Sequence, residues 1–209
     1  MILNKLRIIL IGLSNIFNYS SAPKEEIKII DYETQYVYSE KYSEGEELVL
    51  AKGEYGYSTI VNGEEVIKKE PVNQVLQVGT HKNPDYKGVL TGYGPDCYGC
   101  NKEGYVACQT ENKKNWSLTK NGIIYTDSVY GEVSILAADK TLFPCGTIIE
   151  ITNNRYKKLL GVVLDTGYTM RKQWRQNETV HIDLAFETEE GTNAITNKKT
   201  SYHVKRWGW

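Results

Sequence analysis

The chain has 209 residues and a formal net charge of −1, with charged residues making up 24 % of the sequence. This near balance excludes the strong basic excess that is typical of nucleic-acid-binding proteins, so we expect no nucleic-acid partner. Hydrophobic residues make up 40 %, and the length suits one domain of ordinary size plus a smaller one. Tyrosine is abundant, 16 residues against 3 phenylalanines, which is typical of a β-rich protein with wet sheet faces.

Residues 1–22 have the order of a secretory signal. Lys5 and Arg7 precede an apolar run that begins at Ile8, and small residues at 20–22 suit a cleavage site. The run is shorter than the roughly 20 apolar residues of a membrane span. We therefore predict a signal peptide or an N-terminal membrane anchor here, with a buried N-terminal helix as the alternative. The protein is then expected to be secreted or held at the cell surface.

The next two segments differ in composition. Residues 23–44 are polar and rich in Tyr and Glu, which predicts a linker, or one strand followed by a linker. Residues 45–81 alternate short β-type runs with turn signals, and Asn62-Gly63 between apolar runs is a strong hairpin signal. This pattern predicts a small, elongated β module with little core.

The glycine spacing of residues 45–81, the Asn62-Gly63 hairpin and the closing Gln77-Val-Gly-Thr80 resemble a truncated five-glycine (G-five) domain of bacterial surface proteins. That resemblance implies either adhesion to cell-wall glycans or a spacer.

From residue 88 to residue 209 the sequence contains many short strand-like runs, a density that favours a sandwich or a barrel. Two segments are candidates for short helices, Met170–Gln176 and 188–195. Thr188 is a suitable N-cap, and the acids after it suit the helix dipole. The predicted strands are Gly88–Tyr93, Ile123–Thr126, Glu132–Ala138, Thr147–Thr152, Leu159–Leu164, Val180–Phe186 and Ser201–Arg206.

Three aspartates each follow an apolar run: Asp139, Asp165 and Asp183. Each carboxylate is therefore presented from a rigid element or just beyond one. Burial and a nearby second carboxylate both raise the proton affinity of a carboxyl group. Three such groups brought together would leave one protonated near neutral pH, as a general acid requires. Because side chains alternate along a strand, His181 is expected to share a face with Asp183.

Taken together, residues 88–209 resemble the three-Asp (3D) domain, a double-psi β-barrel of cell-wall lytic enzymes. The resemblance implies a mainly β fold, with a six-stranded double-psi barrel and short helices placed after the elongated N-terminal β module. The matching segments occur in order: Leu90–Tyr93, Leu136–Asp139, Pro144–Thr147, Val163–Gly167, Ile182–Leu184 and Val204–Trp209.

The same resemblance implies a lytic transglycosylase or a related peptidoglycan-cleaving enzyme of a Gram-positive type envelope, acting without a cofactor. Such an enzyme cuts the β-1,4 bond from N-acetylmuramic acid to N-acetylglucosamine. One carboxyl group protonates the leaving oxygen, then accepts the proton of the sugar's 6-hydroxyl as a 1,6-anhydro product closes. Asp183 matches the family's acid/base, Asp165 would support it, and Asp139 would complete the acidic pocket or hold a loop.

Further substrate contacts are expected at Tyr93, Thr166, Gly167 and Arg171, although packing and turn formation are the alternatives for the first two. Arg171 lies in residues 168–178, a longer and basic segment that replaces the family's Gly-Gly-Ala-Ile-Lys-Gly-like loop. Its cations would hold peptide carboxylates of peptidoglycan or simply solvate a helix.

The four cysteines are Cys97, Cys100, Cys108 and Cys145. In an exported protein an even count favours two disulfides, for which three pairings exist. One structural zinc or free thiols are the alternatives. We expect no other metal site, because the sequence lacks a His-x-x-x-His spacing and an EF-hand loop.

Two other functions compete with the enzyme. The Asp165-Thr-Gly167 segment also looks like an aspartic protease motif, but one copy per chain would require a homodimer. A non-catalytic glycan-binding module would bind peptidoglycan without cleaving it. We expect a monomer that binds peptidoglycan glycan strands.

Overall fold

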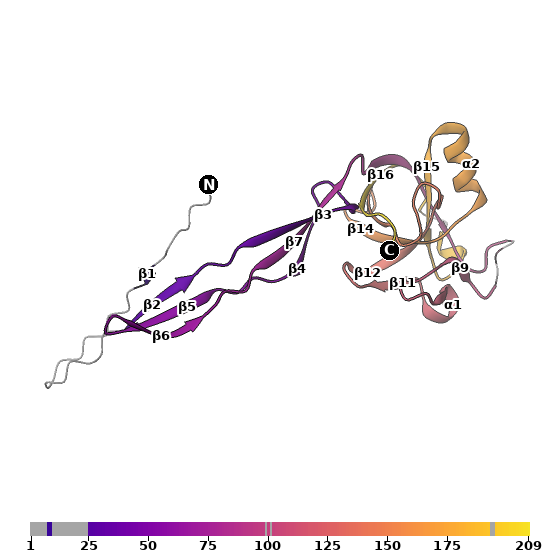
Figure 1. The fold of residues 1–209 in the computed structure, drawn as a ribbon. Coiled ribbons are helices and arrows are strands. Elements are labelled where there is room, and N and C mark those ends of the chain that lie inside the picture. Colours follow the sequence, from indigo (N-terminus) through magenta and orange to yellow (C-terminus); the bar gives the residue numbers. More distant parts are fainter. Residues whose placement is uncertain (1–7, 10–24, 99, 101, 193–194) are drawn as a thin grey trace. The chain divides into compact units, whose positions relative to one another are not determined.

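The structure is a computed structural model that describes residues 8–9, 25–98, 100, 102–192 and 195–209. The chain divides into two compact units, with unit 1 formed by residues 1–39 and 47–78 and unit 2 by residues 40–46 and 79–209 (Figure 1). The expected signal peptide or anchor lies outside the described residues, apart from Ile8 and Ile9. Across the described ranges, the helices are all too short or too polar for a membrane crossing.

Unit 1 consists of β-strands and turns. Asn62 and Gly63 both have positive φ and join β5 to β6, which confirms the predicted hairpin. The segment 25–43 forms strands instead of the expected linker, because its isoleucine-rich start pairs with β5 and satisfies the backbone groups of both strands. One sheet contains the strands β1 (Ile8–Ile9), β2 (Glu25–Ile30), β5 (Gly56–Val61) and β6 (Glu64–Lys69). A second set of paired strands contains β3 (Thr34–Ser43), β7 (Gln74–His81) and β4 (Glu47–Ala51). The last residues of β3 and of β7 belong to unit 2.

Unit 2 is built around a closed six-stranded β-barrel. Going round the barrel, the strand order is β13, β14, β12, β15, β8, β16 and back to β13. The β12–β14 and β15–β8 pairs are parallel and the other four are antiparallel. The strands are β8 (Asp85–Tyr93), β12 (Gly131–Ala137), β13 (Ile148–Thr152), β14 (Leu159–Asp165), β15 (Val180–Ala185) and β16 (Asn197–Arg206), which confirms the six corresponding predictions.

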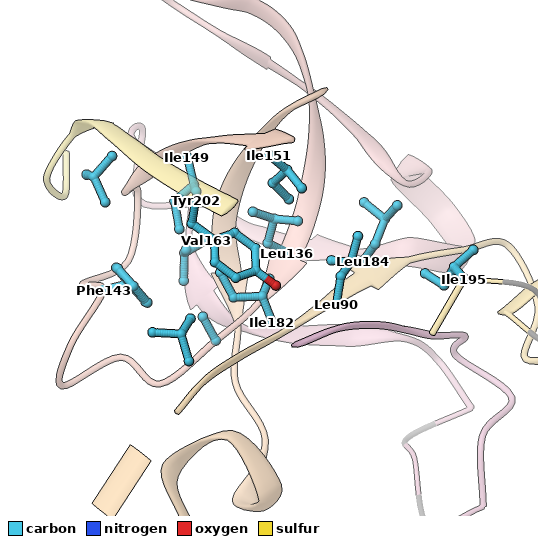
Figure 2. Close-up of a cluster of buried hydrophobic side chains, with 13 residues drawn as sticks. Leu90, Leu136, Phe143, Ile149, Ile151, Val163, Ile182, Leu184, Ile195 and Tyr202 are labelled. Atoms are coloured by element: carbon cyan, nitrogen blue, oxygen red, sulfur yellow. The ribbon is translucent and has the colours of Figure 1, made fainter. Parts of the chain in front are cut away.

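Buried apolar side chains from all six strands fill the barrel interior, as Figure 2 shows. Strand β15 illustrates why the sequence folds this way. Val180, Ile182 and Leu184 alternate with polar residues and are at most 5 % exposed. The opposite face of the strand therefore carries His181 and Asp183.

A second apolar cluster covers the outside of strands β12, β13 and β14. Strand β14 serves both clusters, with Val163 facing the barrel interior while Val162 and Leu164 face the outer cluster. The covering elements are β9 (Tyr105–Gln109), β10 (Asn115–Ser117), α1 (Leu118–Asn121) and β11 (Ile124–Asp127). Of these, only β11 was predicted.

Two helical segments follow the barrel strands. Helix α2 (Tyr168–Asn177) contains the predicted segment and packs through buried Met170 and partly buried Trp174. The helix predicted at 188–195 is reduced to a 3₁₀ turn, η1 (Glu190–Thr192), among the residues described there. Gly191 at its centre explains the short length, since glycine disfavours helix.

Candidate functional site

Asp165 and Asp183 lie on either side of Ala137 in the barrel wall. Ala137 pairs with Asp165 of β14 on one side and with Asp183 of β15 on the other. The register of β12 against β14 shifts between Leu136 and Ala137, which interrupts the regular alternation there, and both aspartates line the same pocket. With strands about 4.8 Å apart, the two aspartate Cα atoms are roughly 10 Å apart, with only a methyl side chain between them.

Thr91 and His181 hold the Asp183 carboxylate. Thr91 of β8 is the register partner of Asp183, and its hydroxyl donates a short hydrogen bond to Asp183 Oδ1. His181 Nε2 lies 3.1 Å from the same oxygen and 2.6 Å from Thr91 Oγ1. The His181 side chain is only 11 % exposed, so it is enclosed within the site. Thr91 was not predicted, although it lies within the matched segment Leu90–Tyr93.

Asp165 is held by backbone donors. Its Oδ1 accepts hydrogen bonds from Thr166 N at 2.8 Å and from Ala107 N at 3.0 Å. Burial raises the pKa of the Asp165 carboxyl, and these two N–H groups only partly offset that effect. The Asp165 side chain therefore keeps its proton to a higher pH than a solvated aspartate does.

An open pocket of about 210 Å³ adjoins both carboxylates. Asp165, Asp183, Tyr93, Thr166 and Gly167 all line it, so five of the predicted site residues come together. Tyr93 lies at the end of β8, and burial, followed by the nearby Asp165, raises the pKa of its hydroxyl well above the usual value. An added Cβ at Gly167 would meet Met170 Sδ at 2.5 Å, so a larger residue there would require the flexible Met170 side chain to shift.

Unpartnered buried polar atoms are concentrated here. Within the described part of the chain, six buried side-chain N or O atoms lack a hydrogen-bond partner. Two of them belong to residues around the two carboxylates, Thr166 Oγ1 and His181 Nδ1, while Tyr93 Oη lies in the same place and interacts with the Asp165 carboxylate. Folded proteins pair nearly all such atoms, so this concentration marks a place suited to a polar ligand.

Asp139 and Arg171 lie apart from this group. The Asp139 side chain is buried in its own turn, where Oδ1 accepts from Thr141 N and Thr141 Oγ1 at 2.9 and 2.8 Å. This is the loop-holding role, one of the two expected for Asp139. Arg171 lines a different hollow on α2.

The cysteines form two disulfides, Cys97–Cys100 and Cys108–Cys145. The first lines the pocket, and the second joins β9 to the turn before β13. Among the described residues, no group of three or more His, Cys, Asp or Glu side chains is arranged to hold a metal ion. The two C-terminal tryptophans, Trp207 and Trp209, pack against the inner and outer clusters respectively.

A buried ion pair on another side of unit 2 was missed. Arg206 NH1 and NH2 donate to Asp127 Oδ1 and Oδ2 at 3.0 and 2.6 Å, and NH2 also donates to Gly146 O. The guanidinium lies 5.6 Å from the Tyr130 ring centroid and 5.5 Å from that of Trp209. No local signal could reveal it, because its partners are 79 residues apart in the sequence.

No protein-family model matches the chain, and a comparison with curated proteins gives no match. A functional assignment therefore depends on the geometry of the pocket and on the chemistry of the residues around it.

Proposed function

We propose that the chain is a peptidoglycan-cleaving enzyme of the lytic transglycosylase type, with a double-psi barrel carrying the active site and the N-terminal strands acting as a G-five-like module at the cell surface. One observation carries the proposal: Asp165 and Asp183 flank Ala137 and line the same open pocket. Cleavage with formation of a 1,6-anhydro product needs one carboxyl group as acid and then base, and a second carboxyl group in the same pocket can raise the proton affinity of the first.

The two carboxylates have different surroundings, which suits a division of labour. Asp183 is oriented through Oδ1 by Thr91 and His181, so its carboxyl group has a fixed direction. Asp165 has the raised pKa that comes from burial. A pair of this kind can retain one proton at a pH where a solvated carboxyl group has lost it.

In the proposed reaction Asp183 gives its proton to the glycosidic oxygen as the bond to C1 breaks. The resulting Asp183 carboxylate takes the proton of the 6-hydroxyl, whose oxygen forms the new bond to C1. The products are a 1,6-anhydro sugar end and a free 4-hydroxyl, with Asp183 protonated again. The Tyr93 and Thr166 hydroxyls, which both line the pocket, would supply hydrogen bonds to the sugar.

Incubation of purified peptidoglycan with the wild type and with Asp183→Asn tests the proposal. We expect 1,6-anhydro products from the wild type, and a kcat lower by about 10²–10⁴-fold for the variant, the usual contribution of a general acid/base. Asp139→Asn is the matched control, because its side chain holds only its own turn and the amide keeps an acceptor. Equal release by wild type and Asp183→Asn would remove Asp183 from this role. Sedimentation with peptidoglycan without any product would favour a binding module.

A further inference from the structure

Helix α2 carries a cationic face beside the pocket. Tyr168, Arg171, Lys172 and Arg175 together line an open hollow of about 390 Å³. Each of these positions lies three or four residues from two of the others, so the four side chains lie along one side of the helix. The other side of α2, with Met170 and Trp174, packs against the protein.

The three cations are not explained by the needs of the helix. None of them forms an ion pair with another residue that the structure describes. Arg171 and Arg175 are like charges one turn apart, and such pairs destabilise a helix. No acidic residue occupies the first turn, where the helix dipole favours one. Residues that destabilise their own helix without a compensating contact are expected at functional positions.

The helix continues directly from the proposed active site. Gly167, the N-cap of α2, and Met170 both line the pocket that holds the two aspartates. At a rise of 1.5 Å per residue, Arg171 and Arg175 lie about 6 and 12 Å along the helix from Gly167. An anion bound by these cations would therefore sit at a fixed, short distance from the scissile bond.

We propose that the cationic face of α2 binds a carboxylate of the peptide attached to the glycan strand. The inference rests on the proposed function and adds a specificity for peptide-bearing substrate. Arginine can grip a carboxylate with two parallel hydrogen bonds, and Tyr168, whose side chain is 73 % exposed, offers a ring for the peptide to lie on. A peptide that is covalently joined to the sugar places its carboxylate at a limited distance from the scissile bond, as the position of the cations requires. A separate phosphate polymer of the wall is not held at any particular distance from that bond, so the geometry favours the peptide.

The test compares the wild type with the triple variant Arg171→Gln/Lys172→Gln/Arg175→Gln. Each protein is given two substrates. The first is teichoic-acid-free peptidoglycan that keeps its peptides, and the second is the same glycan after an amidase has removed the peptides. We expect the triple variant to raise KM at least about tenfold on the peptide-bearing substrate and to leave KM on the stripped glycan unchanged. A control variant, Lys113→Gln/Lys114→Gln/Lys157→Gln, removes the same charge from exposed sites elsewhere and should change neither value.

Sedimentation in an Asp183→Asn background separates the two proposals. Weaker binding of the triple variant to peptide-bearing glycan, with unchanged binding to stripped glycan, supports the inference even if neither protein cleaves. An equal loss on both glycans, or no loss on either, overturns it. A loss seen only with walls that retain teichoic acid would also overturn it, in favour of a phosphate-binding face.

Discussion

Unit 2 holds two aspartates at strand ends whose surroundings are opposite. Asp127 is fully enclosed, yet Arg206 and the N–H groups of Val129 and Tyr130 compensate its charge. Burial acts to raise the pKa of Asp127, but these partners outweigh burial and hold it below its usual value. Asp165 lines an open pocket, where two backbone N–H groups, the Tyr93 hydroxyl and the charge of Lys140 only partly offset burial, and its pKa is raised.

The difference separates a structural carboxylate from a candidate catalytic one. A buried charge with every partner in place fixes the chain around it and has no proton to give. A carboxylate with incomplete compensation costs stability but can exchange a proton near the pH of use. The two disulfides divide in the same way between a structural place and the pocket. Cys108–Cys145 lies next to the structural ion pair, because Cys145 precedes Gly146, whose carbonyl accepts a hydrogen bond from Arg206. Cys97–Cys100 lines the pocket.

The largest effect is expected from Arg206→Leu. The substitution leaves the Asp127 charge buried without its main partner, so the free energy of unfolding should fall by about 3–5 kcal/mol. Chemical denaturation measures it. Adding Asp127→Asn to the same chain should restore part of the loss, and a double variant no more stable than the single one would contradict the ion-pair explanation.

Loss of the Cys108–Cys145 disulfide should lower stability more than loss of the Cys97–Cys100 disulfide. By loop-closure entropy, replacing Cys108 and Cys145, which are 37 residues apart, should lower the unfolding free energy by about 4 kcal/mol. Replacing Cys97 and Cys100, three residues apart, should cost about 2 kcal/mol and also alter KM, because this pair lines the pocket. Chemical denaturation of both double variants measures the two losses of stability, and the KM of the variant without Cys97 and Cys100 measures the effect on the pocket. A larger stability loss from the short loop would reverse the comparison.

A smaller effect of opposite sign is expected from Asp165→Asn. The amide can still accept from Thr166 and Ala107 but carries no charge to desolvate, so Tm at neutral pH should rise by a few degrees while cleavage falls. Thermal unfolding and product release measure the two effects. An Asp165→Asn protein less stable than wild type at neutral pH would refute the uncompensated charge.

The pH dependence of that difference has a definite sign. Because the folded pKa of Asp165 is raised, folding favours the protonated form, and wild type loses this stability as pH rises through the folded pKa. The advantage of Asp165→Asn should therefore disappear below about pH 3.8, the ordinary value of the group. Asp127 contributes oppositely: its stabilisation is lost as pH falls through its lowered pKa.

The elements that sequence could predict are those with a local signal. All seven strands predicted after residue 88 are confirmed to within a few residues, because their apolar runs and flanking turns are local. Asp165 and Asp183 could be placed together through the ordered motifs, and His181 through the period of a strand.

Other features depend on distant partners and left no local trace. The Arg206–Asp127 pair and the Thr91 contact to Asp183 both arise from pairing across the fold. The turn-holding role of Asp139 was one of two expectations, because the sequence could not distinguish a carboxylate that caps its own loop from one that faces a pocket.

Carboxyl-carbon NMR titration of the wild type is the most direct test of the central claim, that Asp165 is poised to exchange a proton and Asp127 is not. The account predicts that Asp165 titrates above 3.8 and Asp127 below it. If Asp165 titrated at or below the value of Asp127, the pocket would lack the carboxyl group of raised pKa that the proposal places beside the acid Asp183.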